Sequence, residues 1–334
     1  MKRLLNKIKR SIFNEEGATI VIVALSFTFL TIIVALVVDI GIAYYKTAEI
    51  ENAADASALA AGQQLPVKAN DANAVANIKN KAIEYAQKNG IENLQASDIV
   101  LTNLVNGYYS QLTVNIPVHI ETNFARIIGI NSIDITRNAK VKITPIKKLD
   151  GVVPLSIDKA GLDYCLANNI TTHLPLKFGG GAGTLGSFGG IDIDGVKGGG
   201  ADDYALWLAY GYTSQLSAGE GMFPVEPGNM AGPTNSALTI RYNSCTHFPG
   251  SGGCTADHYV NKCLRVVKVP VIVYDASRKN VSICGFAAFV IEPLTDSGYI
   301  YGSFIKMTTQ GVPSDTVNFG DALDFGVYTL KLTS

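Results

Sequence analysis

The feature of this sequence that most restricts its fold is an uncharged apolar stretch near the N-terminus. Residues Ala18 to Val38 carry no charged side chain, and their polar groups are limited to Ser and Thr hydroxyls. A helix of this length spans about 31 Å, close to the ~30 Å hydrocarbon core of a bilayer. In lipid, a single apolar segment satisfies its backbone groups only as a helix. The stretch therefore predicts a transmembrane anchor that runs from Ala18 to Val38.

Charged residues on either side of the stretch predict its orientation. Five basic residues lie within positions 2–10, whereas the first charge after the stretch is Asp39. Basic residues stay on the cytoplasmic side. We expect residues 1–16 to form a cytoplasmic basic arm and the rest of the chain to lie outside the membrane. A cleaved signal peptide is the alternative, with small-residue sites at 41–43 or 58–60, although its apolar core usually covers only ~7–15 residues.

The predicted helix continues beyond the membrane. No proline occurs from Asp39 until Pro66, and the segment is rich in alanine, the best helix former. At helical spacing, one narrow face collects small or apolar residues, namely Ile50, Ala53, Ala54, Ala58 and Ala61. Such a face allows another backbone or a sheet to approach closely. We expect one helix over residues 17–65, whose outer half uses this contact face.

Residues 66–145 have the pattern of a small α+β domain. Residues 72–88 place apolar side chains on one helical face, and residues 112–120 and 133–143 alternate between apolar and polar side chains as half-buried strands do. Pro117 interrupts the first of these strands and cannot donate a ladder hydrogen bond, so it predicts an edge or an outward-facing position. Helices followed by antiparallel strands predict a compact α+β unit.

Residues 146–334 predict a Gly-rich, mostly β domain. Glycines crowd positions 179–200, residues 201–210 suggest a short helix, and residues 226–233 contain turn formers at nearly every step. Three β-branched or aromatic runs, bounded by turns, follow at 264–274, 281–293 and 299–309. The whole chain is therefore predicted to be α+β, with a long N-terminal transmembrane helix before the two exterior domains.

Three motifs in the first 145 residues resemble those of a known family. They are Glu16-Gly17-Ala18, the span ending Val38-Asp39-Ile40-Gly41, and the run Asn52-Ala53-Ala54-Asp55-Ala56-Ser57-Ala58-Leu59-Ala60-Ala61. Together they resemble the N-terminal domain of the Tad/Flp pilus-assembly family, the TadG-like group. The segment from Asn123 to Ile143 is similar to the part that closes this domain. The resemblance implies a pilin-like or pilus-assembly protein at a bacterial surface, with the lipid bilayer and pilin-like proteins as its partners.

One departure from the wider type IV pilin pattern narrows that expectation. Pilins of this class are cleaved after a glycine and carry a glutamate five residues later, but Gly17 is followed at that place by Ile22. No carboxylate in the span can pair with the new amino terminus of a neighbouring subunit. This departure favours an uncleaved, membrane-retained component over a bulk filament subunit.

Searches for catalytic and cofactor motifs give no candidate. The Gly-rich run lacks the Lys-Ser/Thr of a phosphate-binding loop. Asp192 and Asp194, with Asp202 and Asp203 nearby, offer oxygen ligands for calcium, but their spacing is not that of an EF-hand, so surface carboxylates in turns are expected. The formal net charge of −1 and the absence of a basic patch beyond residue 10 give no indication of a nucleic-acid partner. We expect no enzyme activity and no cofactor.

The cysteines leave three alternatives open. Cys245, His247, Cys254, His258 and Cys263 lie close together in the chain, in the part expected outside the membrane. There, at least one disulfide between two of Cys245, Cys254, Cys263 and Cys284 is the first expectation. Zinc accepts thiolate and imidazole ligands, although this spacing is not a standard one. Free buried thiols are the third alternative.

The resulting functional hypothesis is a single-pass, non-enzymatic surface protein that supports pilus biogenesis or adhesion. In this hypothesis, the apolar helix docks among pilin helices through small-residue and hydroxyl contacts. Two alternatives remain, namely a membrane-tethered binding module unrelated to pili and a tethered hydrolase.

Overall fold

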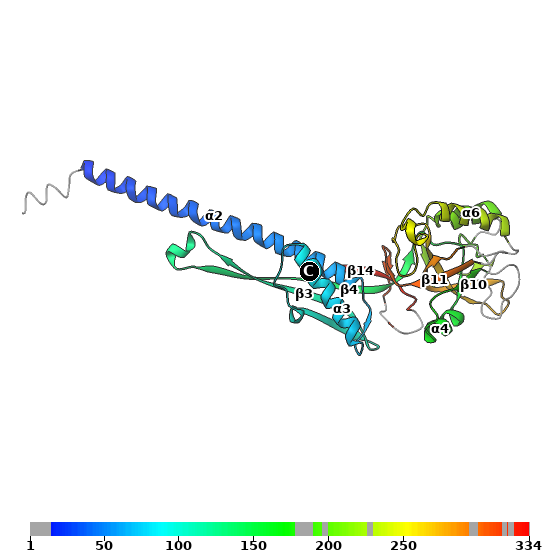
Figure 1. The fold of residues 1–334 in the computed structure, drawn as a ribbon. Coiled ribbons are helices and arrows are strands. Elements are labelled where there is room, and N and C mark those ends of the chain that lie inside the picture. Colours follow the sequence, from blue (N-terminus) through cyan, green and yellow to red (C-terminus); the bar gives the residue numbers. More distant parts are fainter. Residues whose placement is uncertain are drawn as a thin grey trace, which may run out of the picture.

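The structure of the protein is a computed structural model that describes residues 15–177, 190–195, 200–225, 230–293, 300–315, 319 and 324–333. Residues 1–14 of the predicted basic arm lie outside the described residues, as do residues 179–189 and 196–199 of the Gly-rich run. The described chain forms an α+β fold with two folded units, one beside the long N-terminal helix and one farther from it (Figure 1).

The long helix α2 runs without interruption from Glu15 to Gly62, a length of 48 residues. The prediction of one continuous helix is therefore confirmed, although the helix begins two residues before and ends three residues before the predicted bounds of 17 and 65. Its first half projects away from the rest of the molecule, and its second half packs against the sheet of the nearer unit (Figure 1). Alanine-rich sequence and the absence of proline explain why no kink divides the halves.

The nearer unit, which we call the helix-proximal unit, packs α2 and a second helix on one sheet. Helix α3 spans Ala72–Lys88, as predicted, and buries Ile78, Ala82 and Ala86. The sheet has antiparallel pairs between β2 and β3, β3 and β4, and β4 and β14, with the two-residue strands at its margins. Its strands are β1 (Val67–Lys68), β2 (Ile99–Val105), β3 (Tyr108–Glu121), β4 (Ser132–Leu149), β12 (Met307–Thr308) and β14 (Val327–Thr333). Two 3₁₀ turns accompany them, η1 (Ala96–Asp98) and η2 (Ala125–Ile128).

Pro117 lies where β3 has a neighbour on one side only. The register of β2 against β3 begins at the pair Ile99–Val114, whereas β4 continues beyond it and pairs Thr136 with Pro117. Because proline has no N–H to donate, it is tolerated where the strand faces no partner. The edge position predicted for Pro117 is confirmed. Beyond it, β3 and β4 form a long two-stranded hairpin that runs beside α2 (Figure 1).

Strand β14 returns from the far end of the sequence to complete the helix-proximal sheet. It pairs with β4 from Tyr328–Pro145 to Thr333–Lys140. Strand β4 itself continues from this unit toward the second one, so the expected domain boundary between residues 145 and 146 falls inside β4. Two short strands pair with that far end of β4, β7 (Leu216–Ser217) and β13 (Val312–Pro313). The two units therefore share a strand, and the helix-proximal unit is built from both ends of the described chain.

The distal unit is organised around the antiparallel pair β9 (Val266–Tyr274) and β10 (Asn280–Ile291). Further strands extend this sheet, namely β5 (Ile157–Asp158), β6 (Leu174–Lys177), β8 (Phe223–Pro224) and β11 (Ile300–Ile305). Alternate residues of β10 enter two core clusters on opposite faces, with Ala287 and Phe289 in one and Ala288 and Val290 in the other. The first cluster is covered by α4 (Lys159–Ala167), α5 (Gly200–Tyr210) and α6 (Ala231–Asn243).

Two of these three helices differ from the sequence expectation. Helix α5 matches the helix predicted at 201–210, but α4 was not predicted, and α6 begins at Ala231 inside the expected loop 226–233. Pro233 is compatible with α6 because it lies in the first helical turn, where no intrahelical N–H is needed. The distal half is therefore a β-sheet with a helical cover rather than strands and loops alone.

Candidate functional site

Helix α2 provides a surface suited to lipid. Within the described residues, it is the one helix long and apolar enough to cross a membrane, with a mean hydropathy of 3.0 over a window that is 0% buried. Large side chains along it, such as Phe27 and Leu30, are exposed on all sides of the helix. Thr28 and Thr31 donate their hydroxyl hydrogens to carbonyls one turn earlier, so they present little free polarity. The expected anchor from Ala18 to Val38 is thus a candidate membrane span.

Asp39 ties the end of this span to the β3–β4 hairpin. Although it is the first charged residue after the span, its side chain is only 5% exposed. The carboxylate accepts backbone hydrogen bonds from Asn123 at 3.0 Å, Phe124 at 2.8 Å and Ala125 at 2.6 Å. These N–H groups begin the turn η2, where intrahelical acceptors are missing. Asp39 therefore has a structural role, since it fixes the hairpin tip to α2.

The hairpin tip is apolar at the same level as Asp39. Ile127 is 82% exposed, Ile128 60% and Phe124 44%. On α2, Tyr44 and Tyr45 lie about one and a half turns after Asp39 and are also exposed. Aromatic and apolar side chains of this kind favour the region where lipid meets water. The apolar surface of the span therefore continues onto the tip instead of ending at Val38.

The expected contact face of α2 lies inside this molecule. Ala53, Ala54, Ala58 and Ala61 are each 0% exposed, and Ile50 is 2% exposed, all in the core of the helix-proximal unit. At the end of the helix, a Cβ on Gly62 would lie 2.8 Å from Cγ2 of Val141. The small residues therefore allow α2 to approach its own sheet, and this face is not free for a second protein.

Three of the expected cysteines meet one histidine in the distal unit. One ligand atom each from Cys245, His247, Cys254 and Cys263 lies within 4.8 Å of every other, which defines the Cys/His cluster. Cys254 is 0% exposed and Cys263 3% exposed, whereas Cys245 and His247 are half-buried. Two segments supply these residues, the loop after α6 and the turn that precedes β9. All five cysteines carry free thiols in this structure.

The other residues grouped with these cysteines in the sequence lie elsewhere. His258 stacks on Phe248, with ring centroids 4.8 Å apart, and is not part of the cluster. Cys284 lies within β10, where its thiol donates a hydrogen bond to the Val271 carbonyl at 3.2 Å. The structure therefore places Cys284 outside the group formed by Cys245, Cys254 and Cys263.

Backbone donors surround the sulfur atoms of the cluster. Cys254 N–H donates to Sγ of Cys245 and Arg265 N–H donates to Sγ of Cys263, both at 3.4 Å. Burial raises the pKa of the Cys245 thiol, but the hydrogen bond from Cys254 and further contacts within the cluster outweigh burial and lower that pKa to about 6. For Cys263, burial dominates and raises the pKa to about 12.

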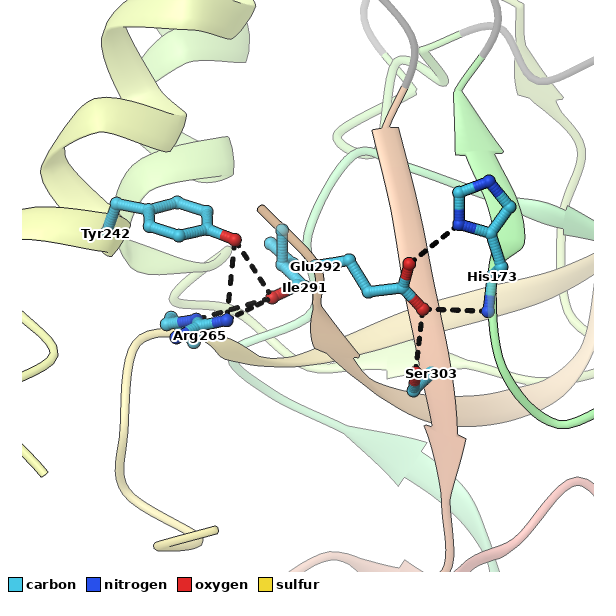
Figure 2. Close-up of polar contacts among 6 residues, drawn as sticks. All are labelled: His173, Tyr242, Arg265, Ile291, Glu292 and Ser303. Atoms are coloured by element: carbon cyan, nitrogen blue, oxygen red, sulfur yellow. Dashed lines mark hydrogen bonds and ion pairs between the residues drawn. The ribbon is translucent and has the colours of Figure 1, made fainter. Parts of the chain in front are cut away.

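Two buried arginines flank the cluster. Arg265 donates to the carbonyls of Ile291 and Gly252 and lies with its guanidinium 4.6 Å from the ring centroid of Tyr242 (Figure 2). Arg241, on α6, donates to the carbonyls of Leu208 and Leu264. Their exposed fractions are 4% and 3%. Among the described residues, neither guanidinium forms an ion pair with a carboxylate, so two positive charges are buried against carbonyls, an aromatic ring and sulfur.

A second polar group lies on the other side of Ile291. Glu292 accepts hydrogen bonds from Ser303 at 2.7 Å and from the backbone N–H of His173 at 2.7 Å, and its second oxygen contacts the His173 ring at 2.8 Å (Figure 2). A nucleophile relay requires the histidine between serine and carboxylate. Here the carboxylate lies in the middle, so this group joins the loop at His173 to β11 and does not form such a relay.

The aspartates considered for calcium do not meet. Within the part of the chain that the structure describes, the Cys/His cluster is the one group close enough to share an ion. Asp202 and Asp203 lie in the first turn of α5, where carboxylates are favoured by the free N–H groups of the helix. Asp192 is buried and Asp194 half-buried, in a separate segment before α5.

Sequence reasoning identified the three cysteines but not the arginines. Arg265 follows Cys263 by two residues, and Arg241 precedes Cys245 by four. Arginines this close to cysteines, within the weakly charged residues 146–334, were the sequence signal that could have indicated their place beside the cluster. Their burial was not predictable, because it depends on the packing of α6 against the start of β9.

The comparisons with known proteins give a match for helix α2 but none for the distal unit. Residues 17–64 match the family model described as putative Flp pilus-assembly TadE/G-like. The resemblance predicted from the three motifs is thus confirmed over α2, from the candidate span to the buried alanines. No curated protein and no solved structure gives a significant match to the chain. The distal unit with its Cys/His cluster lies entirely beyond the matched segment.

Proposed function

We propose that this protein is a membrane-anchored, non-enzymatic component of Flp-type pilus assembly, present as a minor, pilin-like surface protein. The observation that carries this proposal is helix α2, which matches the pilus-assembly family and combines an exposed apolar half with a half buried in a sheet. An N-terminal helix that is apolar outside its own domain is suited to pack with like helices in a bilayer. The large folded part that follows α2 favours a scarce component over a bulk subunit. The absence of a glutamate five residues after Gly17, where Ile22 stands, favours the same conclusion.

The proposal places the membrane surface at Asp39. The span before it requires lipid on every side, and the exposed hairpin tip and the tyrosines after it are suited to the interface. The exterior units then begin immediately above the headgroups. The basic residues at positions 2–10 support a cytoplasmic N-terminus.

Labelling with a membrane-impermeant thiol reagent tests this orientation. We expect the variant Leu5→Cys to react only after the cells are permeabilised and Asn235→Cys, on the exposed side of α6, to react in intact cells. The unaltered chain gives the background from its own cysteines. Labelling of Leu5→Cys in intact cells, or a mature chain that begins after residue 17, would contradict the retained N-in anchor.

Deletion of the gene tests the role in assembly. We expect fewer surface pili, or pili that detach, while the major pilin is still made and stays in the membrane. A matched chain in which residues 19–38 are replaced by an unrelated apolar helix of equal length separates anchoring from specific contact. Failure of this chain to restore pili supports helix–helix contacts in the membrane.

Restoration by the exchanged helix would instead place the functional contact in the exterior units. Unchanged pilus number, retention and adhesion in the deletion strain would refute the pilus assignment. Binding of the purified protein to a surface ligand in that case would favour the tethered binding module.

A further inference from the structure

We propose that Cys245, His247, Cys254 and Cys263 bind one zinc ion, which holds the loop after α6 to the start of β9. The proposed site is structural, because the protein supplies four ligands and leaves no position open for substrate. It is independent of the function proposed above, since it lies in the distal unit and outside the family match.

The donor set and its geometry fit this metal. Three sulfurs and one imidazole nitrogen form a tetrahedral set typical of structural zinc. With Zn–S bonds of about 2.3 Å, sulfurs in a tetrahedral site lie about 3.8 Å apart. The ligand atoms here lie within 4.8 Å of one another, so small side-chain rotations bring them to bonding distance. Nδ1 of His247 is buried without a hydrogen-bond partner among the described residues. Burial of such a nitrogen is unfavourable unless a bond compensates for it.

The backbone around the cluster is arranged for ligands that are thiolates. The N–H groups of Cys254 and Arg265 point at the sulfurs of Cys245 and Cys263, and hydrogen bonds of this kind orient and stabilise metal-bound ligands. Gly253 is in the left-handed region at φ +98°. A Cβ there would collide with Nη1 of Arg265 and come within 3.1 Å of Cys245 Sγ. The loop therefore packs the sulfur and the guanidinium close together.

The net charge of the cluster differs between a bound zinc ion and a disulfide. A zinc ion with three thiolates and a neutral imidazole keeps one net negative charge, and on binding each remaining thiol releases its proton to water. Arg241 and Arg265 lie beside that charge without carboxylate partners among the described residues. A disulfide between two of the three cysteines leaves one thiol, which is neutral unless it ionises, whereas the zinc-bound set keeps its negative charge beside the two guanidinium groups. Buried charges without a counter-ion are strongly disfavoured.

Metal analysis of the full chain tests the proposal. The protein is extracted from native membranes into detergent without chelator, after thiols accessible in the cells have been alkylated, and zinc is measured by elemental mass spectrometry. We expect about one zinc per chain for the unaltered protein. His247→Ala and Cys254→Ser are expected to retain less than about a tenth of that amount. Cobalt(II) exchanged into the unaltered protein should give the visible bands of a tetrahedral thiolate site.

Two types of control keep the test independent of misfolding. His247→Cys preserves four ligands and should restore zinc binding, whereas His258→Ala and Cys284→Ser alter a histidine and a cysteine outside the cluster and should not change zinc binding. A disulfide between any two of Cys245, Cys254 and Cys263 in freshly isolated protein would overturn the proposal. Five free thiols without metal, or zinc retained at an unchanged level in both His247→Ala and Cys254→Ser, would overturn it equally.

Discussion

Removal of residues 327–333 is expected to unfold the helix-proximal unit although the deleted strand lies at the opposite end of the sequence from α2. Val327 and Tyr328 are buried, and the pairing of β14 covers β4 from Lys140 to Pro145. Loss of one large buried side chain alone costs about 3–5 kcal/mol. The whole strand therefore contributes an amount comparable to the total stability of a domain, about 5–15 kcal/mol.

Limited proteolysis of the detergent-solubilised chain measures this effect. We expect cleavage within residues 66–145 of the truncated chain under conditions in which the full chain resists. Tyr328→Ala should show the same change in weaker form, since its ring is 1% exposed and its hydroxyl donates to Asp324. Lys331→Ala is the matched control, because this side chain on the same strand is exposed. Equal protease resistance of truncated and full chains would show that β14 is not required.

Replacement of Ala53, Ala54 and Ala58 by leucine should destabilise the protein itself. All three are completely buried between α2 and its own core. Added side-chain volume in a closely packed core costs about 1–3 kcal/mol per site, and the close approach seen at Gly62 leaves little room for relaxation. A cost of this size lowers the melting temperature by several degrees, at about 4 °C per kcal/mol for a unit of this size.

Thermal unfolding followed by circular dichroism in detergent gives the measurement. Ala56→Leu is the matched control, because it lies on the same helix but is only half-buried and keeps the helix propensity. If the triple variant melts with the unaltered chain yet loses pili, the face contacts a second protein after all. If the triple variant loses both stability and pili, the loss of pili results from misfolding of the protein itself. Contacts with pilins are then expected on the exposed side of α2.

Elements governed by local pattern were predictable from the sequence. The boundaries of α3 follow from its apolar face and its terminal Asn-Gly, and the place of Pro117 follows from its missing N–H. Helix α6 was missed because its first turn contains Gly232 and Pro233 and its apolar face is weak. Tertiary packing on the β9–β10 sheet stabilises it instead of intrinsic propensity.

Long-range relations were not predictable. Thr333 donates a hydrogen bond to the Lys140 carbonyl across 193 residues of chain, and no local pattern encodes that pairing. The same limit applies to the Cys/His cluster. Sequence spacing collected the cysteines but did not distinguish His247 from His258, which lies outside the cluster. The role of Asp39 was also hidden, because its partners on the hairpin are separated from it by more than 80 residues.

Because α2 is continuous, it behaves as one rigid rod. The Asp39 carboxylate binds the hairpin tip where the candidate span ends, and the alanine face holds the rest of the helix against the sheet, so no hinge separates the exposed apolar half from the packed half. From Asp39 to Gly62 the helix extends about 35 Å. A change in helix tilt of about 10° in the bilayer therefore swings the far end of α2 by about 6 Å. With the proposed membrane anchor, a force applied to the two folded units is transmitted as torque on the candidate span.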